Sequence, residues 1–481
     1  EFVVVLQEAP NAVTAEQMVP RLLQAACNGV TIAGKTLRLT ASAGLTRYPQ
    51  TDPVEADQLV RQAHQALYQA KQTGRNCFHL FDTDRDHWIR QMNTLADEVR
   101  YGLERDQFKL WYQPKVNIDT GELVGAEALL RWEHPERGRL SPIHFLPELE
   151  GQAIMREIGR WVLETAADQF EQWMERGQRI PVSVNIDAYT LVQPDFLELV
   201  SDCLREHPRM ARGDLELEVV ETSALQGLER VRHVIKECEA LGVPFAIDDF
   251  GTGYSSLTYL KRLPAQCLKI DRTFVRDMLE DIEDLAIVES ILGLARAFGR
   301  QTVAEGVETL QHGLLLLALG CRVGQGYAIA RPMAGDEMPE WSQNWAPYDE
   351  WREHRLARTE DRPALFAYVE HNAWMFRLQR YLQAREPDPP PMSSAACRFG
   401  RWLMEWRDRR PDHARLTAIE KIHESIHARA AELVSQRPRQ ETQAHRSRAL
   451  HEIGVLHDQL VAELERLVEV RLTAKNRGTS G

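Results

Sequence analysis

The stretch VPFAIDDF, residues 243–250, indicates the fold of the central part of this chain. Its first five residues, 243–247, are all apolar, which is the pattern of a strand buried on both faces. Asp248 and Asp249 follow directly, so their carboxylates are expected at the carboxyl end of that strand. In a (β/α)8 barrel, this end of the strands carries the active site.

The same arrangement recurs through residues 94–345, where short apolar strands alternate with longer helical patterns. This βα rhythm predicts a parallel sheet or a barrel. Polar or charged side chains end six of the strands: Glu127; Asn185; Glu218 and Glu221; Asp248 and Asp249; Lys269 and Asp271; Glu305 and Glu308. Carboxylates that converge at one end repel one another unless cations lie between them, and such oxygen ligands suit Mg²⁺ or Mn²⁺.

Each of these residues also has a structural interpretation. An acidic residue after a strand often caps the next helix or interacts with its dipole, and a lone lysine is often a solvated surface residue. Six such strand ends in one segment are difficult to explain as caps alone. Lys269 lies between Ile270 and an apolar run, which argues against a surface position.

Composition excludes several classes of protein. The 481 residues carry a formal net charge of −13, which argues against a basic surface for nucleic-acid polymers. The longest apolar run, GLLLLALG at residues 313–320, is too short to span a bilayer, so we expect no membrane segment. Seven cysteines without a pairing pattern are typical of reduced thiols, and we expect a cytoplasmic protein.

A set of ordered motifs in the central segment resembles the EAL family of bacterial cyclic di-GMP phosphodiesterases. The motifs are QPKV (113–116), EALLRW (127–132), SVNI (183–186), LEVVET (217–222), DDFGTGYSSL (248–257), LKID (268–271), EGVET (305–309) and QGYAIARPM (325–333). The resemblance implies a TIM-like (β/α)8 barrel in signal transduction that hydrolyses this second messenger to linear pGpG.

The resemblance also implies roles for individual residues. It predicts that one or two divalent cations are held by Glu127, Asn185, Glu218, Asp248, Asp249 and Glu305, and that Lys269 contacts the attacking water. Ligand contacts are expected from Gln113, Arg131, Asp271 and Gln325. Glu221 would anchor the DFGTGYSS loop, which would link the site to a dimer interface, and Glu308 would support the site.

Three positions depart from the usual family pattern: Asp187, Val220 and Arg322. None of them is an expected metal ligand, so we expect activity, although Val220 could weaken coupling to the loop. The competing interpretation is a catalytically silent receptor for cyclic di-GMP. Such a receptor would typically lack a ligand or the lysine, and all are present here.

Residues 1–85 read as a strand at 2–6, a helix at 14–27, a strand at 38–44 and a helix at 54–73. The stretches EFVVVLQE, LTASAGLTRYP and QAHQALYQAKQTGRNCF resemble the second half of a GGDEF diguanylate cyclase domain. The chain then starts inside the motif that names the domain, so we expect this segment not to synthesise cyclic di-GMP.

After a charged linker at residues 346–362, the segment 363–473 reads as helices only and predicts a helical bundle. His423 and His427 lie four residues apart, on one helical face, and His371 and Cys397 lie on other helices. Three histidines and one cysteine suit tetrahedral Zn²⁺, although chance spacing and a buried apolar cysteine were the alternatives.

The order H-x2-W, C-x-F-G-x-W-L and H-x3-H resembles the chemoreceptor zinc-binding (CZB) domain. This resemblance implies a four-helix bundle that binds zinc through His371, Cys397, His423 and His427 and forms a homodimer. Zinc occupancy or thiol oxidation would then regulate the phosphodiesterase, or zinc would only stabilise the bundle. His413, His451 and His457 do not fit the pattern and are expected on the surface.

Overall fold

The computed structural model describes residues 1–6, 12–27, 30–32, 35–37, 40–50, 53–221, 228–253, 257–353, 362–383, 388–395, 397–409, 414–435 and 443–468. The chain divides into two compact units, residues 1–98 and 99–481. Among the described residues, none of the helices combines the length and apolar character needed to cross a bilayer.

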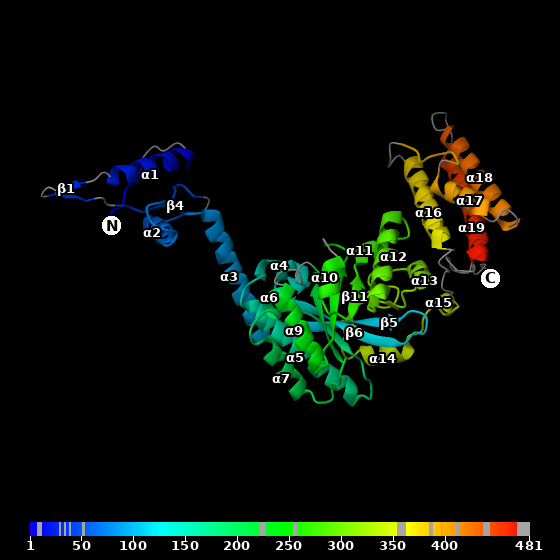
Figure 1. Ribbon diagram of the computed structural model, residues 1–481, viewed down its shortest axis with the longest axis horizontal. Helices are drawn as coiled ribbons and strands as arrows, with labels where there is room; N and C mark the ends of the chain where they lie inside the picture. Colours follow the sequence, from blue (N-terminus) through cyan, green and yellow to red (C-terminus); the bar gives the residue numbers. More distant parts are fainter. Residues whose placement is uncertain are drawn as a thin grey trace. The chain divides into compact units, whose positions relative to one another are not determined.

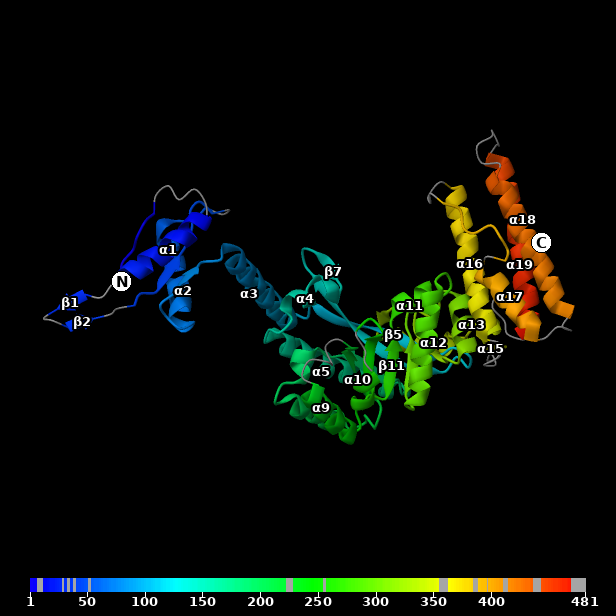
Figure 2. The same ribbon diagram turned by 45° about the horizontal axis from the view of Figure 1, so that its top comes forward.

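The first unit mixes short strands with helices (Figure 2). Its helices are α1 (Ala12–Ala26), α2 (Ala56–Gln72) and the start of α3 (Thr83–Glu104). The strands pair as β1 (Val30–Ile32) with β2 (Lys35–Leu37), antiparallel, and as β3 (Ala43–Leu45) with β4 (Phe78–Leu80), parallel. The two predicted helices are confirmed.

The strand predicted at residues 2–6 is wrong. These residues have no strand pairing, and Phe2 is 98% exposed. An apolar β-branched run becomes a strand only where a neighbouring strand takes its N–H and C=O groups. The strand predicted at 38–44 is replaced by the short β2 and β3, and residues 38–39 lie outside the described structure.

The central segment forms a closed barrel of eight strands (Figure 1), as predicted. The strands are β5 (Phe108–Asn117), β6 (Leu123–His134), β8 (Val182–Asn185), β9 (Leu215–Val220), β10 (Phe245–Phe250), β11 (Cys267–Ile270), β12 (Gln301–Ala304) and β13 (Val323–Gly324). They pair in that order, and β13 pairs with β5 to close the barrel. β7 (Gly138–Leu140) extends the sheet beside β6, and β14 (Met333–Ala334) pairs with β5.

One barrel strand departs from the predicted parallel sheet, because β5 runs antiparallel to both β6 and β13. Only five residues, 118–122, join β5 to β6, and so short a connection makes a hairpin instead of a crossover. Gly121 adopts φ 78°, a conformation that glycine takes without strain. The other six strands run parallel to one another and to β6.

Helices surround the barrel and follow its strands (Figure 1). They are η1 (Pro142–His144), α4 (Leu146–Leu149), α5 (Ile154–Glu175), α6 (Ala188–Leu191), α7 (Phe196–Glu206), α9 (Leu228–Leu241), α10 (Leu257–Arg262), α11 (Arg272–Asp277), α12 (Ile282–Ala297), α13 (Leu310–Leu319), α14 (Met338–Asn344) and α15 (Asp349–Arg352). Buried apolar side chains on the barrel strands, such as Val182, Leu217 and Phe245, form the core. The carboxyl ends of the parallel strands, β5 excepted, lie at one end of the barrel, which positions the polar residues that follow.

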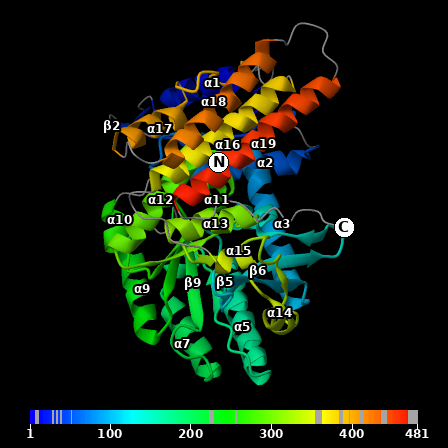
Figure 3. The ribbon, with the colours of Figure 1, turned by 90° about the vertical axis from the view of Figure 1, so that its right-hand side faces the viewer.

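The last part of the chain is a bundle of four helices (Figure 3), as predicted. These are α16 (Arg362–Leu382), α17 (Arg398–Arg409), α18 (Ala414–Ser435) and α19 (Gln443–Val468). Contacts between α18 and α19, α16 and α17, α16 and α19, and α17 and α18 close the bundle around one core. Buried residues from all four helices fill it, including Leu378, Phe399, Ile426 and Leu460.

Candidate functional site

The carboxyl ends of the barrel strands bring the predicted metal ligands together. Two groups of three carboxylates have ligand oxygens within 4.8 Å of one another: Glu127, Glu218 and Asp248 form the first, and Asp248, Asp249 and Glu305 form the second. Asp248 belongs to both groups. Asn185, at the end of β8, donates a hydrogen bond from Nδ2 to Glu127 Oε1 at 2.8 Å, so its amide lies beside the first group.

Lys269 lies at the centre of these carboxylates and is 1% exposed. Its Nζ is 2.5 Å from Glu218 Oε2, 2.6 Å from Glu305 Oε1, 2.9 Å from Asp248 Oδ1 and 3.4 Å from Glu127 Oε2. Burial alone would lower the pKa of this amine, but the surrounding carboxylates raise it well above its usual value. Lys269 is therefore a permanent cation and not the surface lysine of the alternative interpretation.

The carboxylates differ in how their charge is balanced. Burial raises the pKa of Glu127, but Lys269 and hydrogen bonds from Gln325 and Asn185 outweigh it and bring the value to about 2. Burial, then the charge of Glu127, raises the pKa of Glu218 to about 8. Burial, with the charge of Asp248, raises the pKa of Glu305 well above its usual range.

The two carboxylate groups therefore hold more negative charge than Lys269 neutralises. Burial and the neighbouring Asp248 also raise the pKa of Asp249, to about 7. Divalent cations would relieve this repulsion, and carboxylate and amide oxygens are the ligands that Mg²⁺ and Mn²⁺ prefer. The residues present thus fit one or two such ions, with Asp248 placed to serve both.

A second buried lysine was missed by the sequence analysis. Lys115 on β5 lies beneath the carboxylates, with Nζ 2.7 Å from Glu216 Oε1, 3.3 Å from Glu218 Oε1 and in contact with Ser183 Oγ. Burial lowers the pKa of Lys115, yet Glu216 and Glu218 outweigh this effect and raise it overall. The signal was the period of two in QPKV, because Lys115 points to the same side of β5 as Gln113, which pairs with Glu127.

The four predicted ligand contacts lie in different surroundings. Gln325 Nε2 donates to Gln113 Oε1 at 3.0 Å and to Glu127 Oε2 at 2.8 Å, so both glutamines border the first carboxylate group. Arg131 lies four residues beyond Glu127 on β6, hence on the same face, and is half-buried. Asp271 accepts from the N–H of Thr273 at 2.8 Å and so caps α11, as the structural interpretation had it.

The loop after β10 is anchored by one of the two predicted supporting residues. Glu221 is buried, and its Oε2 accepts the N–H of Gly251 at 2.8 Å. Asp249 just before it has φ 52°, an uncommon conformation for a residue with a side chain. Residues 254–256 of the loop lie outside the described structure. Glu308 is exposed, just before α13, and is not part of either carboxylate group.

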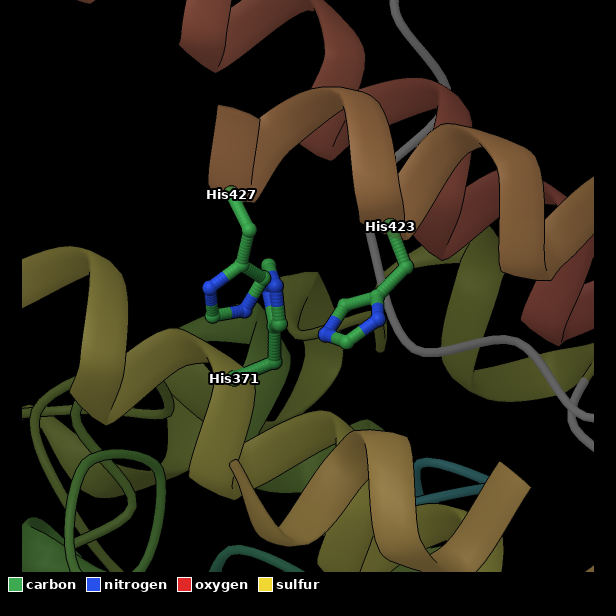
Figure 4. A group of neighbouring side chains, drawn as sticks. All are labelled: His371, His423 and His427. Atoms are coloured by element: carbon green, nitrogen blue, oxygen red, sulfur yellow. The ribbon is translucent and has the colours of Figure 1, made fainter. Parts of the chain in front are cut away.

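The three predicted zinc-binding histidines meet inside the bundle. His371 comes from α16 and His423 and His427 from α18, and their rings point toward one another (Figure 4). All three are 2% exposed, with ligand nitrogens within 4.8 Å of one another. Burial lowers the pKa of His423 to about 3 and that of His371 well below its usual value. The imidazoles are therefore neutral, which is the form that binds metal.

Cys397, the fourth predicted ligand, lies beside His423, with its Sγ 3.1 Å from His423 Nε2, although it is not among the three residues whose ligand atoms all lie within 4.8 Å of one another. The N–H of Gly400 also donates to this sulfur at 3.2 Å. Gly400 has to be a glycine, since a Cβ on it would collide with the backbone oxygen of Ser394.

Unpaired nitrogens support a metal at this position. His427 Nδ1 donates to the carbonyl of Met392 at 3.1 Å, which leaves Nε2 as the free, unprotonated nitrogen. Among the described residues, neither His427 Nε2 nor either ring nitrogen of His371 has a hydrogen-bond partner, although all are buried. Buried polar atoms are rarely left unpaired, and a zinc ion bound by nitrogen and sulfur would satisfy them. The residues present therefore fit zinc.

One of the three histidines predicted on the surface, His457, is only partly exposed. His457 on α19 has a buried Nε2, and its ring centroid lies 5.2 Å from that of His371. It follows the buried Ile453 by four residues and precedes the buried Leu460 by three, so helical spacing puts it on the core face. His451 is exposed as predicted, and His413 lies outside the described residues.

Comparison with known families and proteins agrees with this division. The EAL domain model matches residues 96–332, the diguanylate cyclase GGDEF domain model matches residues 1–77, and the chemoreceptor zinc-binding domain model matches residues 371–434. EAL domains use divalent metal ions and CZB domains bind zinc.

The individual relatives carry names from the same signalling system. The bifunctional diguanylate cyclase/cyclic di-GMP phosphodiesterase MucR of Pseudomonas aeruginosa is 38% identical over 342 residues, which cover 70% of this chain and 49% of MucR. The cyclic di-GMP phosphodiesterase NbdA of the same organism is 36% identical, over 65% of this chain and 40% of NbdA. The chain spans about half the length of the curated relatives it matches, or less.

A solved structure extends the likeness to the fold. The EAL enzyme Bd1971, in its form with cAMP and cyclic di-GMP bound, is 29% identical with a TM-score of 0.51, over 60% of this chain and 76% of that one. EAL homologues of this kind are cyclic di-GMP phosphodiesterases. With these matches and the barrel on which its carboxylates converge, the chain belongs to the EAL domain family, joined to GGDEF domain residues before it and a CZB domain after it.

Proposed function

We propose that the barrel of this chain hydrolyses one phosphodiester bond of cyclic di-GMP to give linear pGpG, with Mg²⁺ or Mn²⁺ as cofactor. The observation that carries the proposal is the pair of carboxylate groups that share Asp248, with Lys269 between them. The names of MucR and NbdA and the ligand bound to Bd1971 point to the same substrate.

The metal ions would be held by Glu127, Asn185, Glu218, Asp248, Asp249 and Glu305. Such ions supply a water of lowered pKa and neutralise charge that develops on the phosphate. Lys269 keeps its proton and donates from Nζ, so it would orient the attacking water and balance the carboxylates when the site is only partly filled. Lys115 holds Glu216 and Glu218 in place from below.

The substrate would lie across the mouth of the barrel, against Gln113, Arg131, Asp271 and Gln325. The guanidinium of Arg131 is planar and remains charged, so it suits a non-bridging phosphate oxygen. The hydrogen bonds between Gln325, Gln113 and Glu127 hold the amide groups rigidly beside the first carboxylate group. Gln325 Oε1 is buried without a partner among the described residues and is free to accept a hydrogen bond from the ligand.

The loop after β10 would couple this site to a homodimer interface. Glu221 fixes the start of the loop through Gly251, next to the two aspartates that bind metal. Glu308 would support the site only indirectly, from its exposed position before α13.

The experiment that tests the proposal is hydrolysis of cyclic di-GMP by the full chain, with substrate and pGpG separated by chromatography. We expect product with Mg²⁺ or Mn²⁺ and none with a chelator or in Glu127→Gln. The matched control is Glu122→Gln, which removes an exposed glutamate at the opposite end of β6 and should leave the rate unchanged. Tight binding of cyclic di-GMP without product in the unmodified chain would instead mean a silent receptor.

We further propose that zinc in the bundle regulates this hydrolysis. The bundle binds zinc through neutral imidazoles and a cysteine, and a change in occupancy or in the thiol would alter its packing. Cys397→Ala should then change how the rate of hydrolysis depends on zinc. An equal rate with and without zinc, in both the unmodified chain and the variant, would mean that zinc only stabilises the bundle.

A further inference from the structure

A fourth imidazole, that of the partly buried His457, borders the candidate zinc site. His457 comes from α19, a helix outside the residues that the CZB model matches. Its ring lies nearly parallel to that of His371, with centroids 5.2 Å apart and an angle of 11° between the planes. Its Nε2 is buried and has no hydrogen-bond partner among the residues that the structure describes.

The distance between the rings of His457 and His371 matches that between two ligands of one zinc ion. The centroid of His371 lies 5.3 Å from that of His423 and 6.0 Å from that of His427, so His457 is as close to it as either. Two imidazoles on one tetrahedral zinc, with Zn–N bonds of about 2 Å, have centroids about 5 Å apart. Both His457 and Cys397 lie outside the set of three nitrogens within 4.8 Å of one another, but Cys397 Sγ is 3.1 Å from His423 Nε2, so Cys397 is placed as the resting fourth ligand.

Among the described residues, no side chain or backbone group forms a hydrogen bond with His457 Nε2. An unpaired polar nitrogen in a bundle core costs free energy unless something binds it. A packing role alone would be met as well by an aromatic carbon ring at this position.

We propose that His457 is a reserve ligand of the zinc centre: when Cys397 Sγ leaves the metal, His457 Nε2 takes the fourth position and zinc stays bound by four histidines. Zinc has no geometric preference from d electrons and is bound in proteins by imidazole nitrogen as well as by thiolate sulfur, so a fourth nitrogen can take the place of the sulfur. The exchange would let the cysteine respond to its surroundings without release of the metal. This inference rests on the zinc centre and not on hydrolysis, so it stands or fails independently of the proposed activity.

A double-mutant cycle on zinc affinity tests the exchange in the full chain. The variants are Cys397→Ala, His457→Phe and the double variant, with zinc dissociation constants measured by competition with a chromophoric chelator. His457→Phe keeps an aromatic ring against His371 and removes the nitrogen. We expect little change in the unmodified background, because Cys397 holds the metal, and a further loss of about 10- to 100-fold in the Cys397→Ala background.

Cobalt in place of zinc gives a second readout. Cys397→Ala loaded with Co²⁺ should keep the strong visible absorption of a tetrahedral ion without the sulfur-to-cobalt band, and the double variant should lose that strong absorption. His451→Phe on the same helix is exposed and serves as the control. Circular dichroism of the metal-free proteins establishes folding, and His457→Gln replaces His457→Phe if the latter unfolds. An equal effect of the His457 variant in both backgrounds would overturn the proposal.

Discussion

Lys115 provides the most direct test of how the barrel keeps its charge buried. Its side chain is 6% exposed, and Nζ lies 2.7 Å from Glu216 Oε1 and 3.3 Å from Glu218 Oε1. Lys115→Met keeps a side chain of similar length and removes the charge. Glu216, whose side chain is 20% exposed, must then remain buried as an unpaired carboxylate or take up a proton.

The expected magnitude follows from these two alternatives. At an effective dielectric constant of about 20, the attraction lost at 2.7 Å is about 6 kcal/mol. Protonation is the cheaper alternative, because neutralising a carboxyl with an unfolded pKa of about 4.3 costs about 3.7 kcal/mol at pH 7 and about 1 kcal/mol at pH 5. We therefore expect Lys115→Met to lower the free energy of unfolding of the barrel by about 3.7 kcal/mol at pH 7 and by about 1 kcal/mol at pH 5.

The direction of the pH dependence follows from Glu216. Burial raises the pKa of this carboxyl, but the attraction of Lys115 outweighs burial and lowers it overall. In the unmodified chain its contribution to stability is therefore present above the unfolded pKa and is lost as the pH falls through the folded pKa. Without Lys115, burial dominates and the folded pKa rises above the unfolded one. The variant should then lose stability as the pH rises from 5 to 7.

Amide hydrogen exchange in peptides that cover β9 measures this stability locally in the full chain, with chelator present and with intrinsic exchange rates corrected at each pH. Lys109→Met is the matched control, because this lysine is exposed on the same strand and should change nothing. The double variant Lys115→Met/Glu216→Gln should recover most of the loss. An equal loss at pH 5 and pH 7 would refute the reasoning, because it would mean lost packing instead of unpaired charge.

Three further predictions follow. Burial lowers the pKa of His207, but its hydrogen bond to Asp168 raises the pKa overall. The pair of His207 and Asp168 therefore stabilises the fold below about pH 6.5, and this stabilisation is lost as the pH rises through the folded pKa. Asp168→Asn should lower the melting temperature at pH 6 by the equivalent of about 1 kcal/mol or less and should not do so at pH 8.5. Gly400→Ala should reduce the zinc content of purified protein, because the new Cβ meets Ser394, whereas Gly454→Ala, in open space, should not. Removal of zinc by a chelator should lower the melting temperature of the bundle, and added zinc should restore it.

The barrel was predictable because strands such as β8, β10 and β11 are short, largely apolar and end in or are followed by polar residues. The direction of β5 was not, because a strand carries no mark of its direction and the length of the connection, five residues at 118–122, decides it. The strand expected at residues 2–6 shows that an apolar sequence alone does not ensure a strand. Composition tells which residues suit a strand, while pairing depends on a neighbour that composition does not reveal.

The candidate site was predictable as far as its residues end strands or follow a helical spacing. Lys115 was missed because it lies inside a strand, where only the alternation of side chains places it beside Glu216. His457 was misplaced because it lacks a family pattern, although its spacing from Ile453 and Leu460 puts it on the core face of α19. In both cases the periodicity of the element carried the information, and the motif did not.

The two candidate metal sites differ in ligand chemistry, and this difference constrains how the proposed zinc regulation can be measured. The barrel offers carboxylate and amide oxygens, whereas the bundle offers neutral nitrogens and a sulfur. Zinc prefers the second set, but zinc also binds oxygen sites more tightly than Mg²⁺ or Mn²⁺ does. The first equivalent of zinc should therefore enter the bundle, and later equivalents should displace the catalytic ion from the barrel. If zinc changes the rate of hydrolysis within one equivalent, and Cys397→Ala abolishes this change, the effect arises from zinc bound in the bundle. If the change grows beyond one equivalent in both the unmodified chain and Cys397→Ala, it arises from zinc bound in the barrel.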